Sequence, residues 1–74
     1  MTVKKKANQL RVGDKIVGNT NYWLIKAIRP SSLTGSMYPI LDVVDAFGKE
    51  MSIETGANEK LQDHIYEVDL APVV

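Results

Sequence analysis

The side chains of this sequence that could take part in acid–base chemistry are one histidine and a set of scattered carboxylates. The chain has 74 residues, a single His at position 64 and no Cys. Nucleophilic hydrolysis needs a Ser or Cys with a neighbouring base, and no strained Gly-x-Ser-x-Gly turn is present. Asp42 and Asp45 lie three residues apart, which points them to opposite faces of a strand. We therefore expect no catalytic residues and no enzyme activity.

Metal and cofactor sites are not indicated either. Without Cys, a metal would have to be held by His64 and carboxylates, and these show no recognisable ligand spacing. A phosphate-binding loop needs a Gly-rich run directly before a helix, and the sequence contains none. We expect no metal and no cofactor, so the sequence favours a binding module over an enzyme.

The charges are segregated along the chain although they sum to zero. Up to Arg29 there are seven basic residues and one acidic residue, and from Pro30 onward there are two basic and eight acidic residues. Such asymmetry is a hint of an electrostatic partner surface. A basic face with an exposed aromatic ring could bind nucleic acid. The candidate nucleic-acid-binding residues are Lys4, Lys5, Lys6, Arg11, Lys15, Tyr22 and Trp23.

A simpler interpretation of the charge pattern receives more weight. In an antiparallel sheet the two halves of the chain can lie side by side, so that opposite charges face each other across strands. The net charge of zero and the pI of about 6.5 also differ from the basic balance usual in nucleic-acid-binding domains. Nucleic-acid binding is therefore kept as an alternative.

A second candidate surface is the segment from Arg29 to Tyr38, which places apolar side chains among small polar residues. Loops on a rigid scaffold often carry recognition, and interface hot spots are enriched in Trp, Tyr and Arg. Trp23 is more readily explained as a packing centre of the small core. The candidate residues for binding a protein partner are Arg29, Leu33, Met37 and Tyr38.

These residues must be positioned by short strands, because turn signals recur every 8–15 residues. Strands are predicted around Tyr22–Ile28, which should end at Arg29-Pro30, and around Tyr38–Val44. Asp45 to Gly48 predicts a type I turn with a left-handed Gly, followed by an alternating strand over Lys49–Glu54. Asn58 can cap one helical turn over residues 58–63.

The segment Leu10–Ile16, which contains Val-Gly-Asp-Lys-Ile, resembles the first strand and turn of small SH3-like barrels, including KOW- and Tudor-type modules. The resemblance covers about residues 10–54 and implies a mostly β fold, a small five-stranded antiparallel barrel with one helical turn. The Gly-rich repeat of a KOW motif and an aromatic cage near Trp23 are both missing. Ribosomal-type RNA contact and methyl-lysine binding are therefore not expected.

The whole chain, residues 1–74, is expected to be one small domain, since a chain of this length has only enough apolar surface for one core. We expect residues 1–8 and 71–74 to be flexible. Neither a signal peptide nor a membrane span is indicated, and the absence of Cys suits the cytoplasm. The favoured function is protein–protein interaction, as an adaptor or inhibitor of a larger protein. The alternatives are nucleic-acid binding and a structural role in a homo-oligomer.

Overall fold

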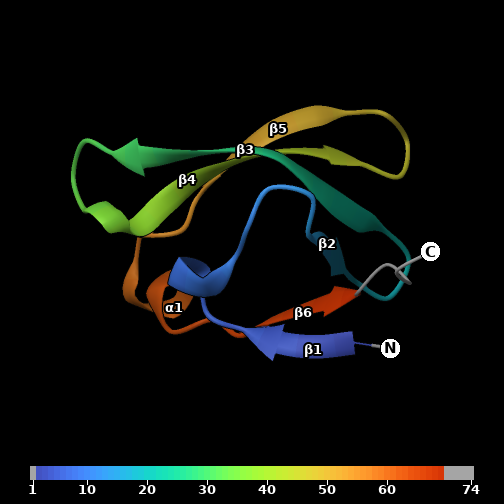
Figure 1. Cartoon of the computed structure of the whole chain (residues 1–74), viewed down its shortest axis with the longest axis horizontal. Coiled ribbons are helices and arrows are strands. Elements are labelled where there is room, and N and C mark those ends of the chain that lie inside the picture. Colours follow the sequence, from blue (N-terminus) through green and yellow to red (C-terminus); the bar gives the residue numbers. More distant parts are fainter. Residues whose placement is uncertain (1, 70–74) are drawn as a thin grey trace.

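Short segments rich in β-branched and aromatic residues form most of the regular structure (Figure 1). A computed structural model describes residues 2–69 of the chain. Two short helical turns interrupt the strands, η1 (Ala7–Gln9) and α1 (Glu59–Gln62). The six strands are β1 (Thr2–Lys5), β2 (Lys15–Val17), β3 (Tyr22–Ser31), β4 (Gly35–Asp45), β5 (Glu50–Glu54) and β6 (Tyr66–Asp69).

All six strands belong to one antiparallel sheet in the order β1-β6-β2-β3-β4-β5. Strands β2 to β5 form a meander, and the chain then returns through α1 so that β6 pairs with β2. The mostly β, antiparallel architecture predicted from the sequence is confirmed. The closed five-stranded barrel is not, because the described sheet has a sixth strand and remains open, with β1 and β5 as its edges.

Strand β1 lies in the segment 1–8 that we expected to be flexible. It pairs with β6 from Thr2 opposite Asp69 to Lys5 opposite Tyr66. Val3 packs against the core, and it is the one apolar residue of this strand, so the sequence signal for β1 was weak. The expected flexible residues 71–74 lie outside the described part of the chain.

Strand β3 continues past the point where the sequence predicted its end. Arg29 is opposite Ile40 and Ser31 is opposite Gly35, so the pairing has an irregularity around Pro30. Proline is tolerated at such an irregularity because its missing N–H breaks no regular ladder hydrogen bond. The β3–β4 hairpin is therefore longer, and its loop shorter, than predicted.

The core lies on the concave side of the sheet, where apolar residues from β2, β3, β4 and β6 meet. Val68 and Leu41 are completely buried. The core includes Trp23 as a partly buried member, as expected for a packing centre. The buried apolar residues are Ala7, Leu10, Ile16, Ile25, Leu41, Val43, Tyr66 and Val68.

Two local predictions are confirmed by their hydrogen bonds. At the β4–β5 turn, Asp45 Oδ1 accepts from the N–H groups of Phe47 and Lys49, both at 2.9 Å, and Gly48 has a φ of 81°. Asn58 caps α1, since its side chain accepts from the Leu61 N–H at 2.9 Å. No helix within residues 2–69 is long and apolar enough to cross a membrane.

Asp45→Asn should weaken the dependence of stability on pH. Hydrogen bonds from the backbone N–H groups of Lys49 and Phe47 hold the pKa of Asp45 below its ordinary value. Its stabilisation is therefore present above the ordinary carboxylate pKa and is lost as the pH falls through the lowered folded value. Urea unfolding followed by Trp23 fluorescence should show a variant less stable near neutral pH, with a smaller loss on acidification from about pH 5 to about pH 2.

The matched control for this prediction is Asp63→Asn, which removes an exposed carboxylate after α1. This variant should lose stability on acidification as the wild type does. An acid loss in Asp45→Asn as large as that of the wild type would show that the turn carboxylate does not contribute.

Candidate functional site

The tip of the β3–β4 hairpin carries the apolar side chains predicted to bind a partner. Leu33 is 80% exposed and Met37 is 63% exposed. Tyr38 differs, because it is partly buried and packs against the core. Arg29 is also exposed, and it lies on β3 directly before the irregularity in the pairing of β3 with β4. The structure therefore presents Leu33 and Met37 to solvent and leaves Tyr38 partly exposed beside the core.

Ser31 holds one side of this tip in place. It is only 5% exposed. Its hydroxyl accepts a hydrogen bond from the Leu33 N–H at 3.1 Å and donates one to a carboxylate oxygen of Glu54 at 3.2 Å. The backbone that carries Leu33 is thus tied to the end of β5.

Thr34 holds the other side of the tip. Its hydroxyl donates a hydrogen bond to the Tyr38 carbonyl oxygen at 2.8 Å. The turn between β5 and α1 approaches so closely that a Cβ on Gly56 would lie 2.8 Å from the Thr34 methyl group and 2.9 Å from the Tyr38 Cβ. A side chain at Gly56 would therefore displace the hairpin tip, which shows how tightly the two segments pack.

Arg29 is bound to its own sheet. Its guanidinium donates two hydrogen bonds to the Asp42 carboxylate, at 2.7 and 2.9 Å, and Asp42 also accepts from the Ser52 hydroxyl at 2.7 Å. The bond from Arg29 is the main reason why the pKa of Asp42 lies below its ordinary value. Arg29 is therefore an exposed residue with a pre-existing ion pair.

Basic residues from the first half of the chain lie next to acidic residues from the second half. Lys26 forms an ion pair with Glu50 at 3.1 Å, in addition to the pair between Arg29 and Asp42. In the sheet, Lys4 is opposite Glu67 and Lys15 is opposite Asp69. The interpretation that opposite charges face each other across strands is thus confirmed at these positions.

The seven candidate residues for nucleic-acid binding differ in their exposure and in their contacts. Lys5 is bound to Asp14 at 3.0 Å. The Lys15 ammonium lies 4.5 Å from the centre of the Tyr22 ring. Trp23 faces the core. The remaining three, Lys4, Lys6 and Arg11, are exposed.

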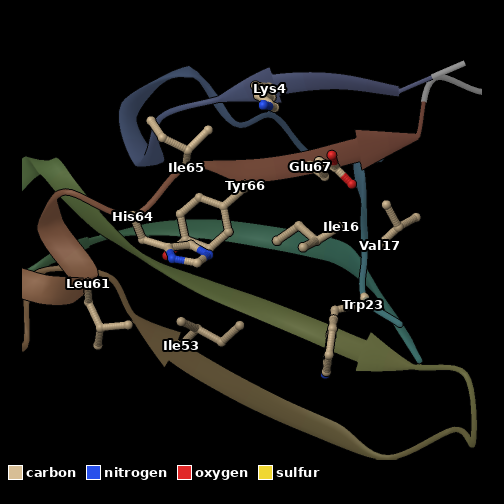
Figure 2. Close-up of a pocket in the computed structure, with 11 residues that line it drawn as sticks. Lys4, Ile16, Val17, Trp23, Ile53, Leu61, His64, Ile65, Tyr66 and Glu67 are labelled. Carbon is tan, nitrogen blue, oxygen red and sulfur yellow. The ribbon is translucent and has the colours of Figure 1, made fainter. Parts of the chain in front are cut away.

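One hollow of the described chain was not predicted from the sequence. It is a cavity of about 640 Å³ on the concave side of the sheet, between β6 and β5. Figure 2 shows Trp23 at one end and His64 with Leu61 at the other. Its lining comes from five strands and the α1 region, so no local motif could reveal it. The lining residues are Lys4, Ile16, Val17, Gly18, Trp23, Ile53, Leu61, His64, Ile65, Tyr66 and Glu67.

Tyr66 is the buried polar group of this cavity. The residue is 6% exposed, and its hydroxyl has no hydrogen-bond partner among residues 2–69. A tyrosine hydroxyl is protonated at neutral pH, and burial raises the pKa of Tyr66 further above its ordinary value. The His64 ring packs edge-on against the Tyr66 ring, with a centroid distance of 4.6 Å.

Carboxylates and His64 do not gather elsewhere into a metal site. Within the described chain, no three His, Asp or Glu side chains come together in an arrangement that could hold a metal ion. The described chain exposes large apolar side chains at the hairpin tip and also at Val12 and Phe47, and it has a hollow between β5 and β6.

Tyr66→Phe should raise the free energy of unfolding by about 1 kcal/mol. A buried hydroxyl without a partner carries a desolvation penalty in the folded state, and Phe removes the hydroxyl while keeping the ring. Urea unfolding should show this as a higher midpoint. Tyr22→Phe is the matched control, because Tyr22 is 37% exposed, and it should change stability by less than about 0.5 kcal/mol. A clear loss of stability in Tyr66→Phe would show that the hydroxyl is bonded in solution.

In comparisons with protein-family models, with curated proteins and with solved structures, nothing matches this chain.

Proposed function

We propose that this protein is a non-enzymatic module that binds a protein partner through the tip of its β3–β4 hairpin. The observation that carries the proposal is the exposure of Leu33 and Met37, at 80% and 63%, on backbone tied down by neighbouring side chains. In a partner's interface these two side chains would lose contact with water, which is the main source of favourable free energy in association.

The fixed backbone of the tip also favours binding. A loop that must order on association loses conformational entropy, and this loss subtracts from affinity. Here Ser31 and Thr34 already hold the tip through hydrogen bonds, and Gly56 packs directly against Thr34. The ordering cost is therefore small, which suits an adaptor or an inhibitor of a larger protein.

Arg29 and Tyr38 take supporting roles in this proposal. Arg29 can add a rim contact while keeping its pair with Asp42, and such exposed charge pairs contribute little affinity. Tyr38 supports the tip from the core side. The binding determinants of the proposed surface are therefore Leu33 and Met37.

The likeness to small SH3-like barrels is also part of the proposal. It is supported by the meander of β2 to β5, which spans residues 15–54 within the segment that carries the sequence resemblance. A strongly curved sheet over a single core is the architecture that the resemblance implies. The open edges of the sheet are a departure from a fully closed barrel.

Nucleic-acid binding has less support than protein binding. The ion pairs of Lys5, Lys26 and Arg29 neutralise much of the basic half locally. What favours this alternative is the exposure of Lys4, Lys6 and Arg11. A homo-oligomer is the third alternative, since β1 and β5 are edge strands of the described sheet and edges can pair with another copy.

A photo-crosslinking amino acid placed at position 33 should capture a partner in extracts of cells that produce the protein. We expect one adduct of defined mass, because a specific interface presents one protein to Leu33. The same amino acid at position 47 is the matched control, since Phe47 is 81% exposed at the β4–β5 turn, away from the hairpin tip. Met37→Ser should reduce the position-33 adduct about tenfold, as expected for a hot-spot residue.

The stability of the variants separates binding from folding. Met37→Ser removes an exposed side chain and should change the free energy of unfolding by less than about 0.5 kcal/mol. Equal adducts from positions 33 and 47, or none from position 33, would contradict the proposal. An adduct with a second copy of the chain would instead support the homo-oligomer, and a nucleic-acid adduct would support the basic-face alternative.

A further inference from the structure

Strands β1 and β5 are the two edges of the sheet, and among residues 2–69 no strand pairs with the outer side of either. In Figure 2 the hollow separates β5 from β1 and β6, so the two edges do not meet within one copy. An unpaired edge presents backbone N–H and C=O groups that a strand of another molecule can bind.

The open backbone groups of β5 follow from its pairing with β4. The Asp45 N–H donates to the Lys49 carbonyl oxygen at 2.9 Å. Hydrogen-bonded and non-bonded pairs alternate along an antiparallel ladder, so Met51 and Ile53 are the residues of β5 that bond to β4. The residues whose backbone groups face away from β4 are Glu50, Ser52 and Glu54.

The open backbone groups of β1 follow in the same way. Two bonds of the β2–β3 hairpin, 2.8 Å at the Gly18 N–H and 2.9 Å at the Asp14 carbonyl oxygen, set the alternation so that Ile16 bonds to β3. Val68 of β6 lies opposite Ile16, so its backbone groups point away from β2 and bond to Val3 of β1. The residues of β1 whose backbone groups face outward are Thr2 and Lys4.

The two edges carry opposite charges. Strand β1 contains Lys4 and Lys5 and no carboxylate, and Lys6 follows it directly. Strand β5 contains Glu50 and Glu54 and no basic residue. The Glu50 side chain is 71% exposed despite its surface ion pair, so its carboxylate can contact a second cation. Each edge therefore complements the other in charge.

Pairing of two like edges is less favourable. A β5–β5 pair along the whole strand would set Glu50 opposite Glu54 of the other copy, and like charges directly opposite each other are destabilising. A β1–β1 pair would gather the lysines of both copies with no carboxylate on either strand. Charge complementarity therefore selects β1 of one copy and β5 of another.

We propose that this protein binds a second copy of itself by antiparallel pairing of β1 with β5 of that copy, in the register that sets Lys4 opposite Ser52. Lys4 and Ser52 then exchange both backbone hydrogen bonds, since the groups of both face outward. The same register sets Lys6 opposite Glu50 of the second copy. Opposite charges at such positions stabilise paired strands.

The other face of the paired strands is apolar in this register. Val3 lies opposite Ile53 of the second copy, and both side chains pack against the cores of their own copies. Pairing therefore removes more apolar surface from water along the concave side of the sheet. A register shifted by one residue would set apolar side chains opposite charged ones.

The proposed contact joins two different surfaces, so each dimer keeps one free β1 and one free β5. Such contacts continue into rings or open chains rather than stopping at two copies. Leu33 and Met37 belong to neither edge strand. The interface thus gives the homo-oligomer alternative a specific geometry, and it does not depend on the hairpin tip.

Analytical ultracentrifugation of the full chain tests the association. From about 10 μM to about 1 mM the mean mass should rise from the monomer value of 8.2 kDa to beyond that of a dimer, and added salt should weaken this rise. Lys6→Glu and Glu50→Lys should each weaken association about fivefold, because each replaces an attraction by a repulsion. An equimolar mixture of the two variants should restore it, since every β1–β5 contact between them is again complementary.

The matched controls are Lys60→Glu and Asp63→Lys, which change the net charge equally at exposed positions away from both edges. They should leave association within about twofold of the wild type. Leu33→Ser should also leave it unchanged, which separates this interface from the hairpin tip. Unfolding curves of every variant show whether the fold is retained.

Disulfide formation tests the register. A Lys4→Cys variant mixed with a Ser52→Cys variant should give the mixed disulfide, because Cα atoms of a hydrogen-bonded pair lie about 5.5 Å apart, within the range that a disulfide spans. Lys4→Cys mixed with Phe47→Cys is the control and should give little mixed product.

Four outcomes would overturn the proposal. They are a monomer mass at every concentration, single charge reversals without effect, no restoration on mixing the two reversals, and a disulfide mainly between two Ser52→Cys chains. A loss of association in Leu33→Ser would likewise show that the copies meet at the hairpin tip instead.

Discussion

The structure depends on one constraint: a single sheet must bury its own concave face, because no helical layer is available to cover it. Both helical elements within residues 2–69 are single turns. The sheet therefore bends along β2, which joins β6 to β3, so that β1 and β6 lie across the core from β3, β4 and β5, as Figure 1 shows. Val68 of β6 lies between Val3 and Ile16 in the sheet, and it is completely buried in the same core cluster as Leu41 of β4. A packed core of this kind supplies most of the favourable free energy of folding.

The same bending explains why the cavity exists. Next to β4, η1 and the residue that follows it place Ala7 and Leu10 in the core. Between β5 and β6 no further strand is present in the described chain, and Trp23, Ile53 and Tyr66 are left to line the gap. The hollow is thus present because β5 and β6 are not paired with each other in the described sheet.

The parts of the fold that could be predicted from the sequence are those that depend on neighbouring residues. Asp45 with Gly48 specifies a turn, and Asn58 specifies a helix cap, through hydrogen bonds within a few residues. Strand β1 and the cavity could not be predicted in this way, since both arise from pairings between distant segments. Nothing in the sequence next to Tyr66 indicated that its hydroxyl would be buried without a hydrogen-bond partner among residues 2–69.

The charges are distributed differently in the folded protein than their order along the sequence suggests. A net charge of +6 before Pro30 and of −6 after it suggests two faces when read along the chain. The register places Lys4 opposite Glu67, and the side chains join Lys26 to Glu50 and Arg29 to Asp42, so the two signs largely cancel within the sheet. Exposed pairs of this kind add little stability but remove long-range attraction for a charged partner. Short-range apolar contacts are therefore favoured over charge for the partner binding that we propose, and the exposed side chains of Leu33 and Met37 can supply them.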